Sequence, residues 1–337
     1  MITRRTRDNV VAAFLGAIIV FGARPAAAQG MALSRFEPSE RGSRFFVADS
    51  LELGDGRLGR KARVAVGVAS AYAYRTRLFG NDREGEETSL VKQAFYVHPG
   101  ASVTVAPGAR FALDVPVAWQ TGTDQNLAGH AYQKPPSPSL GDIRASFDLR
   151  LGKLGPVTFA GGVMGHLPTG SQEAFTGDDY VRFGGRFAAA LEAGSFVVAS
   201  RVGYMYRREG FVGGVPLGSE VNGVLGAAYA RGIWFLGPEL WTSTTLDDPF
   251  AKRTTPVDVL VGAHATFGDL RAGFATGRSI APGLGSTYLR VALSFEWVPR
   301  PSDQTSDRDH DGVPDESDPC PDVAGSAGGC PPVPAGP

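Results

Sequence analysis

The sequence predicts an all-β protein, a transmembrane antiparallel β-barrel of about 12 strands followed by an irregular calcium-loop tail. Apolar and polar residues alternate over many segments long enough to cross a membrane as tilted strands. Short and long connections alternate between these segments, and no segment shows a sustained helical period. These observations favour a barrel whose wall has one apolar face and one polar face.

Residues 1–28 are predicted to be a signal peptide. Arg4, Arg5 and Arg7 precede an apolar run over residues 10–23, and Ala26-Ala27-Ala28 offers a cleavage site of the A-x-A type. This run is too short for a transmembrane helix. The mature chain is therefore expected to begin near Gln29 and to leave the cytoplasm.

Residues 29–60 precede the first predicted strand and are rich in charged side chains between Arg35 and Asp49. Two placements are open for this segment. It either lies inside the barrel lumen as a plug or stays in the periplasm.

Residues 61–299 are predicted to form the barrel. Segment 289–297 shows the pattern well, because Leu289, Leu293 and Trp297 share one face while Arg290 and Glu296 share the other. The predicted strands lie near 62–78, 90–105, 109–121, 139–152, 155–167, 180–193, 195–207, 217–230, 233–245, 256–267, 269–278 and 284–298.

The connections between these strands differ in length in a regular way. Short turns are expected near 107–108, 152–155, 194–195, 231–232 and 268–269, with longer loops between them. Outer-membrane barrels have short periplasmic turns and longer outside loops. An even number of strands brings the chain back to the side where it entered, so the sequence predicts a bacterial outer-membrane protein with its tail in the periplasm.

A soluble β-sandwich or barrel would also alternate, but its core would have to bury the charges on the second face of the strands. Aromatic residues such as Tyr74, Trp119 and Trp297 lie near predicted strand ends, where membrane barrels carry aromatic girdles. Strand parity directs the following charged residues toward the lumen: Arg144, Arg150, Arg182, Arg186, Arg201, Arg207, Arg271, Arg290, Asp114, Asp142, Asp148, Glu192, Glu220, Asp258 and Glu296.

Residues 300–337 carry the spacing of a calcium loop. Carboxylates occupy loop positions 1, 3, 5, 9 and 12, a glycine occupies position 6, and the carbonyl of position 7 completes the set. Prolines on both sides exclude the flanking helices of an EF-hand. The alternative is a solvated acidic tail without metal. The expected Ca²⁺ ligands are Asp307, Asp309, Asp311, Val313, Asp315 and Asp318.

Cys320 and Cys330 are the two cysteines of the chain, and both lie in this tail. In an exported protein they suggest one disulfide, with a pair of free thiols as the alternative.

The tail resembles a thrombospondin type 3 repeat, since the pattern D-x-D-x-D-G-x-x-D-x-x-D-x-C-P is matched from Asp307 to Pro321. A signal peptide, a barrel and such a repeat together are similar to the front of OmpA-family outer-membrane proteins. In longer members this repeat links the barrel to a peptidoglycan-binding domain. That domain is expected to be absent here, so the resemblance does not imply anchoring to the cell wall.

Two functions remain open. One is a narrow pore for small polar solutes, and the other is a non-conducting structural or adhesion-type barrel that anchors a calcium-stiffened periplasmic stalk. The expected partners are outer-membrane lipid, calcium ion and a periplasmic protein. A formal net charge of −1 gives no support for a nucleic-acid partner. Paired loop acids such as Asp178-Asp179 show no nucleophile–base spacing, so no catalytic residue, organic cofactor site or enzymatic activity is expected.

Overall fold

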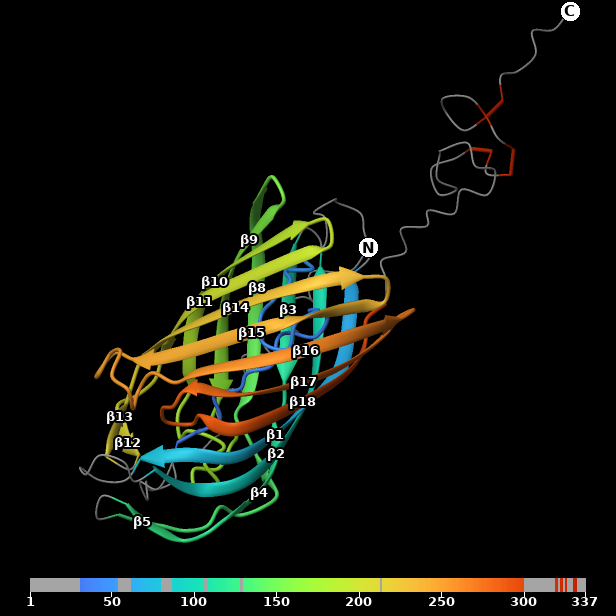
Figure 1. Ribbon diagram of the computed structural model, residues 1–337. Coiled ribbons are helices and arrows are strands. Elements are labelled where there is room, and N and C mark those ends of the chain that lie inside the picture. The colour runs from blue at the N-terminus through green and yellow to red at the C-terminus, as the bar shows by residue number, and fades with distance from the viewer. Residues whose placement is uncertain are drawn as a thin grey trace, which may run out of the picture.

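The structure is a computed structural model, and it shows a closed antiparallel β-barrel (Figure 1). It describes residues 31–53, 62–79, 87–105, 108–127, 130–212 and 214–299, and in the tail 319–320, 322–323, 325 and 330–331. The predicted signal peptide and the predicted calcium ligands Asp307 to Asp318 lie outside the described residues. No helix in the described part of the chain has the length and apolarity needed to cross a membrane.

The barrel closes between its first and last strands. Strand β1 pairs with β2 on one side and with β18 on the other, so that Val66 faces both Ala101 and Trp297. The barrel strands are β1 (Arg63–Phe79), β2 (Glu87–Val105), β3 (Ala109–Asp114), β4 (Val117–Gly122), β7 (Ser139–Leu140), β8 (Ile143–Leu154), β9 (Val157–Leu167), β10 (Arg182–Ala193), β11 (Phe196–Tyr206), β14 (Glu220–Arg231), β15 (Trp234–Thr245), β16 (Val257–Phe267), β17 (Leu270–Ala281) and β18 (Thr287–Trp297).

Two crossings of the wall are interrupted. Strands β3 and β4 are consecutive halves of one crossing, separated at Val115-Pro116, and β7 and β8 are halves of the next, separated at Gly141-Asp142. Pro116 has no N–H to give to the ladder, which explains the first break. Counted as crossings, the fourteen strands of the closed sheet make a barrel of twelve, so the predicted fold is confirmed.

The connections follow the predicted asymmetry. Residues 194–195 and 268–269 are among the short turns, and they lie at the end of the barrel where β1 begins and β18 ends, here called the turn end. The longer loops gather at the opposite end, the loop end (Figure 1). Two small hairpins that the alternation did not predict lie in these loops, β5 (Gln125–Leu127) with β6 (His130–Tyr132) and β12 (Gly210–Val212) with β13 (Val215–Leu217).

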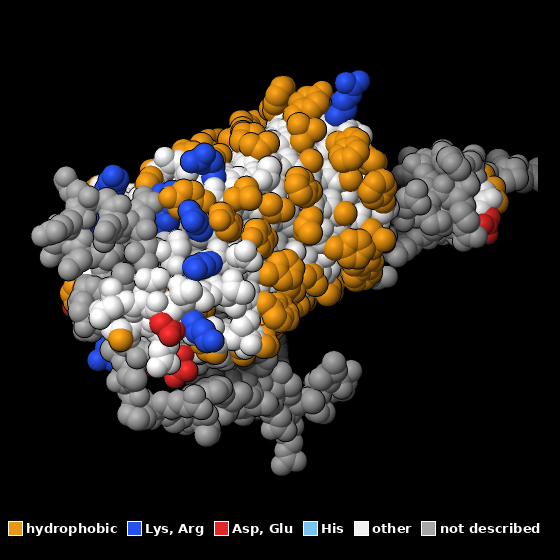
Figure 2. Space-filling model, turned by 60° about the horizontal axis from the view of Figure 1, so that its bottom comes forward, with side chains coloured by type: hydrophobic (Ala, Val, Ile, Leu, Met, Phe, Trp, Pro, Cys, Tyr) orange, Lys and Arg blue, Asp and Glu red, His pale blue; other side chains and the backbone are white. Residues whose placement is uncertain are grey.

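The two faces of the wall have opposite character. In β18, Leu289, Leu293 and Phe295 are exposed on the outside, whereas Arg290 and Glu296 are buried inside. Figure 2 shows hydrophobic side chains spread over the outer wall. The predicted lumen charges are buried except at two positions, because Arg150 is half-buried beside a register shift in β8 and Glu192 is exposed near the turn end.

The tail contains a disulfide between Cys320 and Cys330, whose Cα atoms are 5.1 Å apart. The predicted pairing is therefore confirmed.

Candidate functional site

Residues 31–53, here called the plug segment, lie inside the barrel. The Leu33 N–H donates to the carbonyl of Phe175 in a loop of the loop end (3.1 Å). At the other extreme, Arg63 at the start of β1 donates to Glu52 (3.0 Å). The plug segment therefore runs the length of the lumen, from the loop end to the turn end (Figure 1).

An apolar cluster surrounds the start of the plug segment at the loop end. Met31 and Leu33 are buried there by side chains from four different loops and from the beginning of a wall strand. Burying this apolar surface stabilises the plug segment in its place inside the lumen by roughly 25 cal/mol per Å². The side chains around Met31 and Leu33 are Leu90, Tyr132, Phe175, Val212, Val215, Leu217 and Leu284.

The middle of the plug segment fills the lumen with aromatic side chains. Phe36, Phe45 and Phe46 are buried against inward-facing residues of the wall, many of which are alanines. A side chain at Gly226 of β14 would meet Phe45, because a Cβ there would lie 2.8 Å from the ring. Small residues on the inner wall thus make the room that the plug segment occupies. The alanines are Ala71, Ala160, Ala188, Ala190, Ala199, Ala228, Ala275 and Ala292.

A chain of buried ion pairs joins the plug segment to strands β3, β8 and β10. Glu40 accepts from Arg186 (2.9 Å) and from the hydroxyl of Ser146 (2.8 Å). Asp148 lies between Arg186 (2.6 Å) and Arg110 (2.8 Å). Arg110 in turn pairs with Asp49 near the end of the plug segment. Removing one member would leave buried charges without partners, which is costly in a dry interior.

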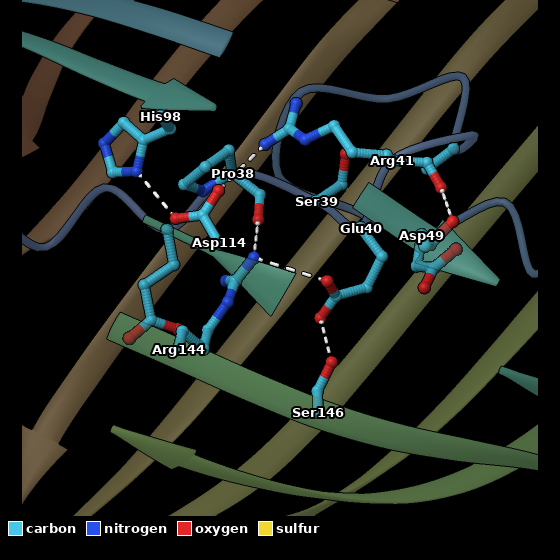
Figure 3. A network of polar contacts seen from close by, with 12 residues as sticks. Pro38, Ser39, Glu40, Arg41, Asp49, His98, Asp114, Arg144 and Ser146 are labelled. Carbon is cyan, nitrogen blue, oxygen red and sulfur yellow. Dashed lines mark hydrogen bonds and ion pairs between the residues drawn. The ribbon is translucent and has the colours of Figure 1, made fainter. Parts of the chain in front are cut away.

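Arg41 makes a second bridge near the turn end. Its guanidinium contacts Asp114 of β3 (3.2 Å) and Glu296 of β18 (3.1 Å). The imidazole Nδ1 of His98 lies 2.8 Å from the other oxygen of Asp114, so this carboxylate has two partners (Figure 3). One plug residue therefore ties together strands near the beginning and the end of the barrel.

The side chain of Glu239 in β15 binds the backbone of the plug segment at residues 46–48. Its carboxylate accepts from the N–H groups of Phe46, Val47 and Ala48, each at 2.7 Å. Three successive amides on one carboxylate are charge-assisted hydrogen bonds in a backbone nest. Glu239 is buried, so water competes little for these amides.

Asp178, in the loop between β9 and β10, fixes the start of the plug segment. It accepts from the N–H of Ala32 (3.2 Å) and pairs with Arg182 (2.7 Å) and Arg207 (3.2 Å). Burial acts to raise the pKa of the Asp178 carboxyl, but the guanidiniums of Arg207 and Arg182 outweigh burial and hold that pKa below its ordinary value. The carboxylate is therefore charged at neutral pH and keeps its bond to the plug segment.

The spaces left between plug segment and wall are small. One of them has a volume of about 60 Å³ and lies beside Phe36, His98 and Arg144. Another, of about 40 Å³, lies beside Arg35, Arg201 and Trp241. A single water needs roughly 10–15 Å³ by the same measure, so these volumes hold a few waters and not a continuous pore.

Strand parity placed most of the charged wall residues of this site on the inner face, but it did not identify the residues of the plug segment that pair with them. Arg110, His98 and Glu239 were missed, although parity within 109–121 and 233–245 would have placed Arg110 and Glu239 on the inner face. Within the described residues no group of three or more His, Cys, Asp or Glu side chains could hold a metal ion. The predicted calcium ligands lie outside the described residues and stay a prediction.

No protein-family model matches the sequence, and no curated protein matches it. Among solved structures, the chain is similar to an outer-membrane channel from Pseudomonas putida F1, with 14% identity and a TM-score of 0.52, over 73% of this chain and 98% of that chain. It also matches the NanC porin, with 7% identity and a TM-score of 0.47, over 70% of this chain and 99% of that chain. The first likeness shows that the chain has the fold of an outer-membrane β-barrel.

Proposed function

We propose that this protein is an outer-membrane channel that the plug segment holds closed and that admits small polar solutes when the plug segment moves. The observation that carries the proposal is the polar contact surface between plug and wall. Glu40, Arg41 and Asp49 each bond to charged wall residues inside the lumen. A permanent core would gain as much from apolar contacts, because buried ion pairs contribute little net stability.

The polar inner wall supports the choice of solute. With the plug segment withdrawn, Arg110, Arg186, Asp148 and Asp114 would face water in the lumen, while the apolar outer face would stay against lipid. A lumen lined with both signs of charge suits small polar solutes better than apolar ones. The apolar outer wall likewise supports the proposed place in the outer membrane.

The filled lumen also supports the second function, a barrel that never conducts. The two functions differ in whether the plug segment moves, so the decisive experiment fixes it in place. A Cβ on Gly42 of the plug segment would lie 3.3 Å from the Cβ of Ala65 in β1. This is close to the roughly 3.5–4.5 Å of a disulfide, although the positive φ of Gly42 adds strain for a cysteine.

The full mature protein with Gly42→Cys and Ala65→Cys is recorded in planar lipid bilayers beside the wild type. We expect infrequent openings in the wild type, none in the oxidised double variant, and their return after reduction. The wild type with reductant is the control, because reduction also opens the bond between Cys320 and Cys330. A silent wild type, together with a silent variant lacking residues 31–53, would reject the channel and leave the structural barrel.

We further propose that residues 307–318 bind one calcium ion and that this tail lies in the periplasm. The carboxylate spacing and the resemblance to a thrombospondin type 3 repeat in an OmpA-family-like arrangement support this. A single loop of this kind is expected to bind in the range of about 10⁻⁴–10⁻³ M. Calorimetric titration with calcium should show saturable binding that Asp311→Ala abolishes. Equal heats from both proteins would reject the site. The proposed function includes no catalytic step.

A further inference from the structure

Arg201 of β11 is a buried cation without a matching anion in the described part of the chain. Its exposed fraction is 7%, and it forms no ion pair with any described carboxylate. Its Nε atom is buried and has no hydrogen-bond partner. A buried guanidinium is normally paired, because leaving it unpaired costs several kcal/mol. Arg201 therefore differs from Arg110 and Arg186, whose partners come from the wall and the plug segment.

Arg201 lines the cavity of about 40 Å³, here called the arginine cavity. Ser34, Arg35, Glu37 and Val47 of the plug segment form one side of it. The other side comes from the wall strands and the residues that follow them, and it includes two further arginines, Arg182 and Arg207. The arginine cavity thus lies between the plug segment and the wall of the barrel.

The polar atoms of the arginine cavity that lack a hydrogen-bond partner are N–H donors, apart from the hydroxyl of Ser34. Arg35 Nε, Arg201 Nε, Arg207 Nη1 and Trp241 Nε1 are all buried, and none has a hydrogen-bond partner. Four buried N–H groups around one small space call for a ligand that only accepts hydrogen bonds. Water would satisfy them poorly, since it must also place its own two hydrogens.

The carboxylates of the arginine cavity do not meet this need. Glu220 pairs with Arg35, and Glu37 lies 3.5 Å from His166 and remains partly exposed. Asp178 pairs with Arg182 and Arg207 from outside the lining. None of these three acids forms an ion pair with Arg201.

We propose that the arginine cavity binds a small oxyanion of the phosphate class, with Arg201 as its main ligand. A guanidinium presents donors in a fork that matches two oxygens of such an anion. Arg207, which follows β11, and the indole N–H of Trp241 in β15 complete the set of donors. A volume of about 40 Å³ offers room for roughly three waters, which one small oxyanion can replace.

The bound anion would bridge plug segment and wall, since Arg35 belongs to one and Arg201 to the other. It would therefore stabilise the closed arrangement in proportion to its concentration. This inference needs the plug segment in place but does not depend on whether the barrel conducts.

The test is calorimetric titration of inorganic phosphate into the full mature protein in detergent micelles, at constant ionic strength. Arg201→Gln removes the charge inside the arginine cavity. The control is Arg208→Gln, which removes one positive charge next to Arg207 in sequence, because Arg208 is exposed, holds its guanidinium over the ring of Tyr180 and does not line the arginine cavity. Arg201→Lys tests whether the paired N–H donors of the guanidinium are needed, because lysine keeps the positive charge but lacks this pair of donors.

We expect saturable binding in the wild type and in Arg208→Gln. Arg201→Gln should weaken it by about tenfold or more, and Arg201→Lys by less. Far-UV circular dichroism confirms that each variant is folded, and Arg201→Lys decides the matter if Arg201→Gln does not fold. No saturable heat in the wild type up to tens of millimolar phosphate would overturn the inference. Equal weakening by Arg208→Gln and Arg201→Gln would also overturn it, because binding would then follow the general charge of the protein.

Discussion

Replacing Glu239 by alanine should release the plug segment without disturbing the barrel wall. The carboxylate of Glu239 accepts three backbone N–H groups, from Phe46, Val47 and Ala48, and the variant leaves all three without that partner. The side chain of residue 239 points into the lumen, so the ladder between β15 and its neighbours keeps its own hydrogen bonds.

The size of the effect follows from the number and kind of these bonds. A hydrogen bond to a charged group contributes roughly 1.5–3 kcal/mol, so three give an upper bound of about 4.5–9 kcal/mol. Burying the carboxylate of Glu239 offsets several kcal/mol of this. A net loss of about 3 kcal/mol raises the ratio of released to bound plug segment by roughly 100-fold, because each 1.4 kcal/mol is a factor of ten.

The assay is the open probability of single channels in planar bilayers. The control is Glu192→Gln, since Glu192 also bonds to the plug segment, through Arg44, but its side chain is 55% exposed. An exposed pair contributes about 0–1 kcal/mol, so the control should open at most a few times more often than the wild type. Equal open probabilities for Glu239→Ala and Glu192→Gln would refute the view that the nest holds the plug segment.

Three further predictions test other parts of the structure. The pKa of Asp178 is lowered, so its stabilising contribution is full above the ordinary value of 3.8 and is lost as the pH falls through the still lower pKa of the folded state. Channel openings should therefore become more frequent in that acidic range, and Asp178→Asn should make them more frequent at neutral pH. An open probability of Asp178→Asn equal to that of the wild type would contradict the role of Asp178. Asp148→Asn leaves two buried guanidiniums without their shared negative partner and should lower the free energy of unfolding in urea by about 3–5 kcal/mol. The control Asp124→Asn, in a long loop, should change this free energy by less than about 0.5 kcal/mol. Similar values for the two variants would argue against the ion-pair chain. Val261→Arg, on the outer face in the middle of β16, should lower the stability of the protein folded into lipid vesicles by about 2–4 kcal/mol. The control Phe250→Arg, in a loop, should change this stability little. Equal stability of Val261→Arg and the wild type would mean that this face does not contact lipid.

The wall of the barrel was predictable because alternation with a period of two is a local signal. Each residue of β18 has its face fixed by its neighbours in sequence, so Leu293 and Glu296 could be placed without knowledge of other strands. The breaks in two crossings were not predicted from alternation, although Pro116 offers a local reason for the first of them. The hairpins β5/β6 and β12/β13 are too short to show a period.

The contents of the lumen were harder to predict because they depend on contacts distant in sequence. The plug segment has no regular secondary structure, so no period places Phe46 beside Glu239. The sequence could show that Arg186 and Asp148 face inward, but Glu40, the second acidic partner of Arg186, comes from outside the barrel strands. For that reason the sequence alone leaves two placements open for residues 29–60, inside the lumen as a plug or in the periplasm.

The passage of the plug segment along the whole lumen has a consequence for the order of assembly. The plug segment leads directly toward β1 at the turn end, while its other extreme reaches the loop end, and Arg41 touches Glu296 of the final strand. Threading a chain with so many charges into a finished cylinder costs the desolvation of those charges before their ion pairs form. Closing the seam between β1 and β18 around a plug segment that is already in place avoids this cost, so we expect the plug segment to be a core around which the strands assemble.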